Sequence, residues 1–390
     1  MLAIGLNLSS SVISIVELLK SRNNIIIRKM IRAEVPSDSV IKGEIQKPEI
    51  LANSLKEIWR KYKIPDRKVF IGIANQKVIA KEIKIPVIND TEIKSSIEYQ
   101  ISDFIPIPKN NIIYDYYIVE KGEDHSRIML VGAMKSMIDD VVYSFKNAGL
   151  LAQVIDLNCF ALYRTVNHIY GLEKIGKDEK SKKMDTFCVV NLGTEISIIE
   201  MIHDYSLKYP RFTSTSIRSF MDELYKEVKK DNKYCEEMIS GFDFKILMAK
   251  KSSEVTKKVE YKDTLSKPRL KATKKADESG DIENVIVSKN LTEIFKKNAD
   301  RFIEEIGLSI EHFLQENPKS NIGKIILTGE YIKNIDKYIE QEIQYKVELL
   351  NITDSFPLKD LKGFGDYNDK NLNYVLDPMA LGMAIRGLNQ

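Results

Sequence analysis

The chain of 390 residues has few cysteines and histidines and lacks a long apolar run. Its three cysteines, Cys159, Cys188 and Cys235, are far apart and have no CxxC spacing, which argues against a disulfide framework and a structural zinc site. The four histidines show no HExxH spacing, so a zinc-protease site is not expected. No stretch of about 18 apolar residues is present, and the N-terminus begins directly with a strand pattern. We therefore expect neither a transmembrane helix nor a signal peptide.

The charge of the chain is also small, because 59 Lys and Arg residues are nearly balanced by 56 Asp and Glu residues. A net charge of +3 gives no general basis for nucleic-acid binding. The scattered thiols fit a reducing compartment such as the cytoplasm. A length of 390 residues exceeds what one small core needs, so two or more domains are expected.

Two distant segments of the chain share one pattern: an apolar strand, a small polar turn and a second strand. The first runs from Asn7 to Leu18 and the second from Asn191 to Met201. The tip of such a hairpin offers several backbone N–H groups to a phosphate. Two copies that face each other across a cleft would hold a nucleotide from both sides. Two unrelated hairpins made of common residues are the alternative.

The elements that follow the two hairpins repeat as well. A third strand and a helix are predicted at 24–31 and 48–62, and again at 206–212 and 217–229. The same order of three strands and a helix therefore occurs twice. This indicates that whole domains are duplicated, not hairpins alone.

Each predicted domain carries an insertion. The first domain, 1–180, contains a β-α-β-β-α unit at about 78–150. The second domain, 184–390, contains a segment at about 230–290 that is mostly rich in Lys, Ser, Glu and Asp and poor in apolar residues. We expect this segment to be a flexible basic insertion, and a solvated linker is favoured over a contact with lipid headgroups or a partner.

Several short segments, in order along the chain, have counterparts in one known family. They are Ile4–Ser11, Phe104–Pro106 with Asp115–Tyr116, Ala148–Leu150 with Asp156, Leu327–Glu330 and Ala380–Gly387. On these segments the chain resembles the actin-like ATPase superfamily and, within it, the PilM family of type IV pilus assembly proteins. The resemblance implies an α/β, actin-like (ribonuclease H-like) fold. Two duplicated domains would surround a nucleotide cleft, with a small α/β insert subdomain in the first.

The resemblance also implies which residues form the nucleotide cleft. The residues expected to contact ATP are Asn7, Ser9, Ser10, Ser11, Asn191, Gly193, Thr194, Thr328, Gly329 and Glu330. In this superfamily each hairpin usually carries an aspartate, which holds hydrated Mg²⁺ and orients the attacking water. Asn7 and Asn191 stand at those positions here, and a neutral amide cannot neutralise a divalent cation.

Two further departures affect the same cleft. Ser9 replaces a small glycine, and Glu330 replaces the second glycine of the adenosine segment, where a carboxylate would crowd or repel phosphates. We therefore expect weak binding of ATP with Mg²⁺, negligible hydrolysis, no catalytic residue and no cofactor or metal required for structure. Asp156 is expected to cap the following helix rather than orient a water molecule.

A protein partner is the other implication of the resemblance. Proteins of the PilM family bind the short cytoplasmic N-terminal tail of the membrane protein PilN, and so couple the motor to the inner-membrane platform. Their groove lies between the first subdomain and its insert, which corresponds to 78–120. Ile101, Phe104 and Ile105 either line that groove or pack the core of the insert, and the sequence favours neither. Contacts with other platform and motor proteins, indirect membrane contact at the inner membrane, and a homo-oligomer or ring are implied; nucleic acid is not.

Two other functions stay open from sequence. An active ATPase or kinase of this superfold needs a carboxylate base, and no supported candidate is found. A cell-division membrane tether of the FtsA type normally ends in an amphipathic helix, whereas this chain ends four residues after Arg386. The sequence does not distinguish a pilus from a secretion or competence system.

Overall fold

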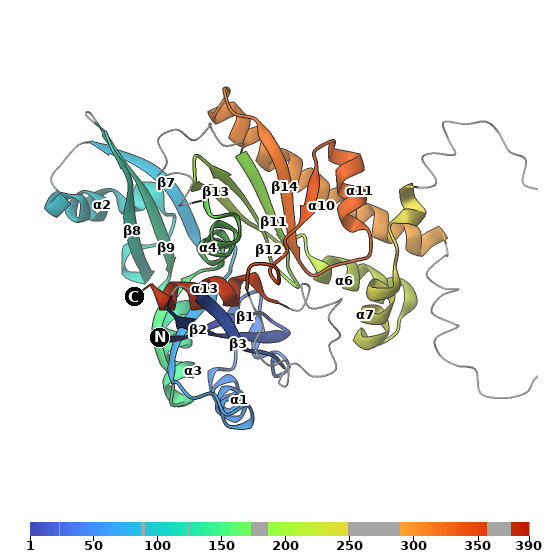
Figure 1. Cartoon of the computed structure of the whole chain (residues 1–390), viewed down its shortest axis with the longest axis horizontal. Helices are drawn as coiled ribbons and strands as arrows, with labels where there is room; N and C mark the ends of the chain where they lie inside the picture. The colour runs from blue at the N-terminus through green and yellow to red at the C-terminus, as the bar shows by residue number, and fades with distance from the viewer. Residues whose placement is uncertain are drawn as a thin grey trace, which may run out of the picture.

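The computed structural model describes residues 1–22, 24–86, 90–122, 125–172, 186–248, 289–356 and 376–389. Two five-stranded sheets, one from each half of the chain, form its centre, and a three-stranded sheet stands beside them (Figure 1). Among these residues no helix is long and apolar enough to cross a membrane.

The first sheet has the strand order β10-β6-β1-β2-β3. Its strands are β1 (Leu2–Leu8), β2 (Val12–Ser21), β3 (Asn24–Glu34), β6 (Lys68–Ile73) and β10 (Leu151–Leu157). β1, β2 and β3 are antiparallel neighbours, whereas β1, β6 and β10 run parallel. Nearly every residue of β1 is buried, as expected for a central strand with an almost continuous apolar sequence.

The second sheet repeats this topology, with the order β13-β12-β11-β14-β15. Its strands are β11 (Thr186–Leu192), β12 (Ser197–His203), β13 (Ser206–Thr213), β14 (Ile322–Gly329) and β15 (Val347–Leu349). Three antiparallel strands are again followed by two parallel ones. The duplication predicted from the two hairpins is therefore present in the strand topology.

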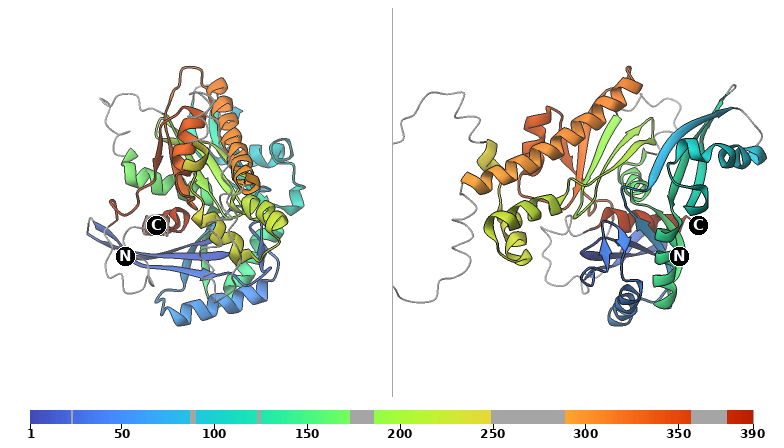
Figure 2. Two further views of the ribbon diagram at one scale, coloured as in Figure 1. Left: turned by 90° about the vertical axis from the view of Figure 1, so that its right-hand side faces the viewer. Right: turned by 180° about the vertical axis from the view of Figure 1, so that it is seen from behind.

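Eight longer helices cover these sheets in the described part of the chain. They are α1 (Pro48–Lys61), α3 (Lys135–Asn147), α4 (Asn158–Tyr170), α6 (Ile217–Val228), α7 (Asn232–Gly241), α10 (Lys289–Glu316), α11 (Ile335–Ile343) and α13 (Pro378–Leu388). A short ribbon of β4 (Val40–Ile41) and β5 (Glu44–Ile45) lies between β3 and α1. Figure 2 shows α1 at the outer side of the first sheet and the long α10 along the second.

The C-terminal helix α13 does not stay with the second domain, to which the sequence assigned residues 184–390. It packs against β1, β2 and α4, all from the first half of the chain. Ten of its eleven residues are buried, which explains its strongly apolar sequence. The last segment of the chain therefore completes the first domain.

The insert subdomain is smaller than the predicted 78–150. It consists of β7 (Ile79–Pro86), α2 (Asp90–Phe104), a 3₁₀ turn (Lys109–Asn111), β8 (Ile112–Lys121) and β9 (His125–Met134), with the sheet order β7-β9-β8. α3, predicted as its last helix, packs against α1 instead, and its buried side chains belong to the core of the first domain. The insert thus ends near residue 134.

The predicted insertion at about 230–290 also begins later than expected. Residues 232–241 form α7, whose Cys235, Met238 and Ile239 side chains are buried. Its lysine-rich part, 249–288, lies outside the described residues.

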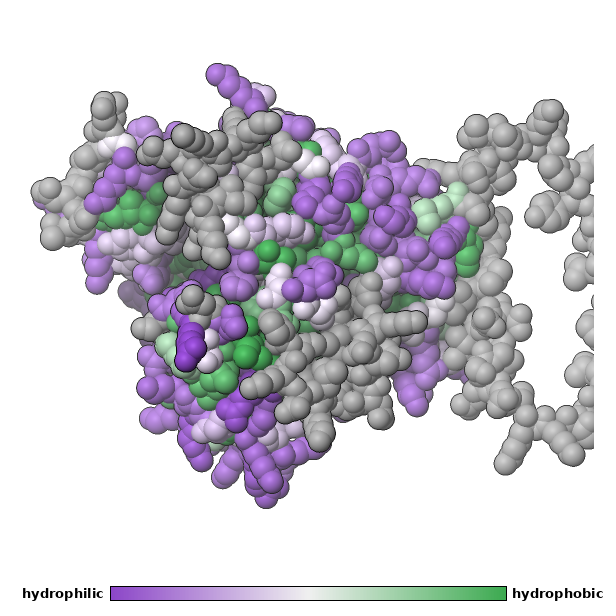
Figure 3. All heavy atoms as spheres, viewed as in Figure 1, coloured by the Kyte–Doolittle hydropathy of each residue, from purple (hydrophilic) through white to green (hydrophobic). Residues whose placement is uncertain are grey.

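On the face drawn in Figure 3, hydrophobic side chains gather over the middle of the molecule, where the two halves meet. Hydrophilic side chains dominate over α10 and α11. Smaller groups of hydrophobic side chains show elsewhere on this face as well.

Candidate functional site

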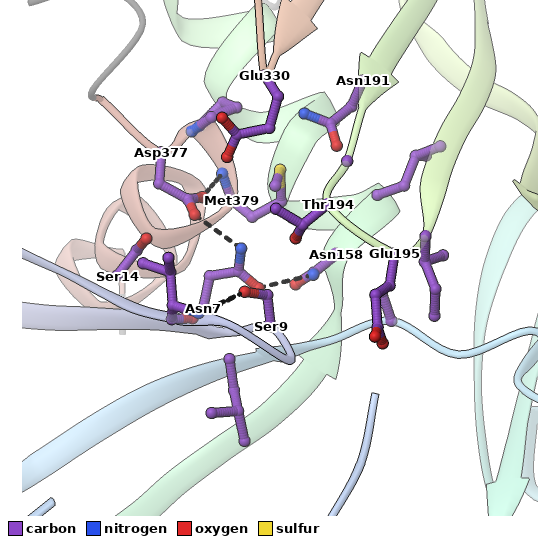
Figure 4. Close-up of a pocket in the computed structure, with 18 of the residues that line it drawn as sticks. Asn7, Ser9, Ser14, Asn158, Asn191, Thr194, Glu195, Glu330, Asp377 and Met379 are labelled. Atoms are coloured by element: carbon purple, nitrogen blue, oxygen red, sulfur yellow. Dashed lines mark hydrogen bonds between the residues drawn. The ribbon is translucent and has the colours of Figure 1, made fainter. Parts of the chain in front are cut away.

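The tips of the two repeated hairpins face each other across a cavity of about 80 Å³ between the domains (Figure 4). Most of the predicted cleft residues line it: Asn7, Ser9, Ser10, Asn191, Gly193, Thr194, Gly329 and Glu330. Ser11 and Thr328 do not line it: Ser11 is exposed, and Thr328 lines a small hollow that shares Gly329 and Glu330 with the cavity. Asp377, at the start of α13, is a lining residue that the sequence did not suggest.

Asn7 is held on both sides by hydrogen bonds. Its Nδ2 donates to Asp377 Oδ2 at 2.7 Å, and its Oδ1 accepts from Asn158 Nδ2 at 2.8 Å. Asp377 in turn caps α13, since its Oδ1 accepts from the backbone N–H groups of Met379 and Ala380 at 2.9 and 3.0 Å. The amide at position 7 therefore ties β1 to the N-terminus of α13, a task that requires a donor.

We expect Asn7→Asp to lower the free energy of unfolding by about 1–2 kcal/mol at pH 7.5, because it places a second carboxylate against Asp377. Repulsion raises the pKa of one carboxyl of the pair, so the lost stability should return as the pH falls to 5. Urea unfolding at both pH values measures this. Asn7→Ala, which removes the hydrogen bonds without adding charge, is the control and should show little pH dependence. An Asn7→Asp variant as stable as the wild type at pH 7.5 would contradict the role given to Asn7.

Asn191 holds the equivalent position in the second hairpin but is bonded differently. It is 1% exposed, and its Nδ2 has no hydrogen-bond partner among the described residues. Gly329 lies beside it with a φ of +94°, and a Cβ there would stand 2.6 Å from Asn191 Nδ2 and 2.3 Å from the carbonyl oxygen of Leu192. Only glycine fits this left-handed position. The second half of the cavity thus contains an unused buried donor.

Two carboxylates of the second domain reach across the cavity to the first. Glu195 accepts from the Ser10 hydroxyl and, at 2.6 Å, from the backbone N–H of Lys42. Glu330, expected to repel phosphates, turns instead to Arg32, with an Nη2–Oε1 distance of 3.2 Å. Both contacts join the two domains directly.

The residues present do not fit a molecule of ATP with Mg²⁺ in this arrangement. Nucleotide-sized ligands occupy cavities of about 300–1,000 Å³, whereas this one measures about 80 Å³. Three carboxylates, Asp377, Glu195 and Glu330, line it, and two neutral amides stand where the superfamily has aspartates. Among the described residues no group of three or more His, Cys, Asp or Glu side chains is arranged to hold a metal ion.

A second and larger hollow, of about 500 Å³, lies between the insert, α4 and the start of β13. We call it the β8–α4 groove. Its walls include Ile113 and Tyr117 of β8, Phe160 of α4 and Leu207 of the second domain. Tyr117 packs edge-on against Phe160, with ring centroids 6.1 Å apart, and burial raises the pKa of Tyr117 to about 12. The tyrosine is therefore neutral, and the walls of the groove are largely aromatic and aliphatic.

Asp156 lies at the edge of this groove and not at the nucleotide cavity. Its Oδ2 accepts from Arg164 Nη2 at 2.6 Å and also contacts Arg386 of α13. Its Oδ1 accepts from the N–H of the next residue, while Leu157 is the N-cap residue of α4. The predicted helix-capping role is therefore wrong. Asp156 is the centre of an ion-pair cluster that joins β10, α4 and α13.

The predicted partner-binding residues do not line the groove. Ile101 and Ile105 are 2% and 1% exposed in the core of the insert, and Phe104 packs against the same core. Of the two alternatives predicted from sequence, these residues therefore follow the second: they pack the core of the insert. The alternation in β8 could have located the groove: Tyr114 and Tyr116 pack on the insert core, so Ile113 and Tyr117 must point to the other face.

One solved structure matches this chain over nearly its whole length, and two others match it less well. The solved structure of a PilM-PilN type IV pilus biogenesis complex matches with a TM-score of 0.75 at 18% identity, covering 99% of this chain and 98% of that one. Ethanolamine utilization protein EutJ from Carboxydothermus hydrogenoformans follows, with a TM-score of 0.49 at 10% identity, covering 98% of this chain and 90% of that one. MreB5 of Spiroplasma citri bound to ADP has a TM-score of 0.43 at 13% identity, covering 90% of this chain and 92% of that one. No curated protein matches the chain in sequence.

The fold is therefore the actin-like fold expected from the sequence. The model of one sequence family, described as type IV pilus assembly protein PilM, matches residues 5–237, which is more than half of the chain. The chain belongs to the family of type IV pilus assembly protein PilM.

Proposed function

We propose that this protein is a cytoplasmic scaffold of the inner-membrane platform of a type IV pilus or related secretion machine. It binds the N-terminal cytoplasmic tail of a PilN-like membrane protein and is peripheral to the membrane through this partner. Family membership supports the assembly role. The solved structure that matches with a TM-score of 0.75 is a complex of PilM with PilN, which supports the partner. Other platform and motor proteins, and further copies of the chain, are expected partners on the same family grounds.

The β8–α4 groove is the binding site that we assign to the tail. The observation that carries the assignment is the exposure of large apolar side chains in a hollow of about 500 Å³. Ile113 is 40% exposed and Tyr117 44%, although both stand on a strand whose opposite face is packed against α2. An extended apolar peptide would bury them, and aromatic side chains in pockets commonly carry much of the energy of such contacts.

The nucleotide cavity has a minor part in this proposal. We expect weak ATP binding and negligible hydrolysis, because Asn7 is engaged with Asp377 and the cavity is narrow. The same observations disfavour an active ATPase or kinase. A membrane tether of the FtsA type would sediment with liposomes in the absence of partners, and our proposal expects no sedimentation.

The test is a calorimetric titration of the full chain with a synthetic peptide of the PilN-like tail from the same organism. Tyr117→Ala should weaken binding about tenfold, since it removes an aromatic wall of the groove. Tyr99→Ala is the matched control, because Tyr99 belongs to the same insert, is 90% exposed and lies outside the groove. Equal affinities for the two variants would refute the assignment of the groove, and no binding to the wild type would refute the proposed partner.

A further inference from the structure

Glu195 occupies an unusual place for a carboxylate. It belongs to the tip of the second hairpin, yet its Oε2 lies against the first domain, where the Ser10 hydroxyl and the Lys42 backbone N–H both donate to it. Figure 4 shows its side chain at the edge of the cavity, apart from Asn7 and Asp377. The donors come from two different turns, the first hairpin tip and the turn between β4 and β5.

The β4–β5 turn is fixed in position by its own contacts. Asn75 Nδ2 donates to the carbonyl oxygen of Lys42 at 2.7 Å. Gly43 has a φ of +76°, and a Cβ there would stand 1.9 Å from the carbonyl oxygen of Ala74 and 3.6 Å from Ile196 Cδ1. The N–H of Lys42 is therefore held facing the second hairpin whether or not Glu195 is present.

A hydroxyl and an oriented backbone N–H are donors that phosphate oxygens also use. The buried Asn191 Nδ2, which has no partner among the described residues, adds a third donor on the other side of the same cavity. These donors come from both domains, and the first two of them are already used by the protein's own carboxylate.

We propose that these three donors form an anion site and that Glu195 is its built-in occupant. The phosphate groups of a nucleotide reach the Ser10 and Lys42 donors only after the carboxylate leaves. The inference rests on the weak nucleotide binding of the proposed function and gives it a cause. The pair of Arg32 and Glu330 is a second contact across the same cavity, and there too the carboxylate comes from the second domain. An incoming polyphosphate is repelled by the negative charge of Glu195 and of Glu330. In the absence of a polyphosphate, the contacts of these two carboxylates keep the cleft closed.

The first measurement is a titration of the full chain with Mg-ATP and, separately, with sodium tripolyphosphate. Glu195→Ala and the isosteric Glu195→Gln should bind both probes at least tenfold more tightly than the wild type. Glu34→Ala is the charge-matched control, since Glu34 is an exposed carboxylate at the end of β3. It should bind the probes within twofold of the wild type. Glu195→Gln supplies the test should the alanine variant fold poorly.

The second measurement follows closure of the cleft. The three native cysteines are buried, so dyes can be attached to cysteines introduced at the exposed positions Lys56 of α1 and Lys226 of α6. The distance between the dyes should increase in Glu195→Ala relative to Glu34→Ala. Unchanged probe affinity in both Glu195 variants, or micromolar binding of ATP by the wild type, would overturn the inference. Binding of the PilN-like tail is measured separately, and its absence in the wild type would count against the proposed partner while leaving these results interpretable.

Discussion

Gly382→Ala is expected to lower the free energy of unfolding by about 3 kcal/mol or more. A Cβ at this position of α13 would lie 1.8 Å from the carbonyl oxygen of Ala161 and 2.8 Å from its Cα. These are backbone atoms of α4 and cannot move aside as the end of a flexible side chain can. The whole of α13 would have to shift, although nearly all of its residues are buried.

The opposite side of α13 leaves no room for that shift. A Cβ on Gly5 of β1 would stand 2.0 Å from the carbonyl oxygen of Ala380, so the helix is in close contact with the sheet as well. Because Asp377 at its N-terminus lines the nucleotide cavity and Arg386 near its C-terminus pairs with Asp156 at the groove, a displaced α13 would disturb both sites. Tail binding should therefore weaken together with stability.

Denaturant unfolding measures the effect, and another helical glycine provides the control. Gly307 lies in α10, and a Cβ there would meet nothing within 4 Å. Gly307→Ala should be neutral or stabilising by up to about 1 kcal/mol, since alanine is the better helix former. If both variants lost the same stability, the close contact between α13 and α4 would not be what matters at Gly382.

The sequence predicted those parts of the fold that depend on local patterns. The hairpin strands are nearly continuous apolar runs, and the strands and helices predicted at 24–31, 48–62, 206–212 and 217–229 end within three residues of β3, α1, β13 and α6. The sequence also identified the neutral amides Asn7 and Asn191, because they occupy equivalent positions in the two hairpins. What the amide of Asn7 does could not be predicted, since its partner Asp377 is 370 positions away.

The failures share one physical cause, which is contact between segments that are distant in sequence. α3 has the helical spacing expected of it, but only its packing on α1 assigns it to the first domain. Asp156 precedes a helix, as a capping residue does, yet Arg164 and Arg386 compete for its carboxylate. Glu330 was expected to face phosphates, and Arg32 of β3, 298 positions away, faces it instead.

The duplicated hairpins also contain a matched pair of buried acids, Glu17 in β2 and Glu200 in β12. Glu17 is 1% exposed and pairs with Arg28 at 3.1 Å. Glu200 is 0% exposed, lies beside Cys159 of α4 and Cys188 of β11, and has no hydrogen-bond partner for either carboxylate oxygen among the described residues. Burial raises the pKa of both acids, but only Glu17 has a cation that offsets the effect. Glu200 is therefore the member of the pair that penalises folding at neutral pH.

We expect Glu200→Gln to raise the free energy of unfolding by about 2 kcal/mol or more at pH 7, because it removes a buried group that must either stay protonated or carry an unpaired charge. A carboxyl with a raised folded pKa binds its proton more tightly in the folded state. The wild type therefore loses about 1.4 kcal/mol for each pH unit above the unfolded pKa of about 4.5, until the folded pKa is reached.

Urea unfolding of the wild type and the variant at pH 4.5, 6 and 7.5 should thus show a difference that is smallest at pH 4.5 and grows with pH. Glu17→Gln is the internal control, as it removes the equivalent acid together with an ion pair to Arg28. It should gain little or lose stability, with a weaker pH dependence, because the cation left behind is no longer neutralised. The same acid at the same hairpin position would then affect stability in opposite ways in the two domains. The difference arises because β3 supplies a cation, Arg28, to Glu17, whereas β13, which the structure describes in full, supplies none to Glu200. A pH-independent difference for Glu200→Gln would mean that Glu200 is ionised and solvated, in conflict with its complete burial.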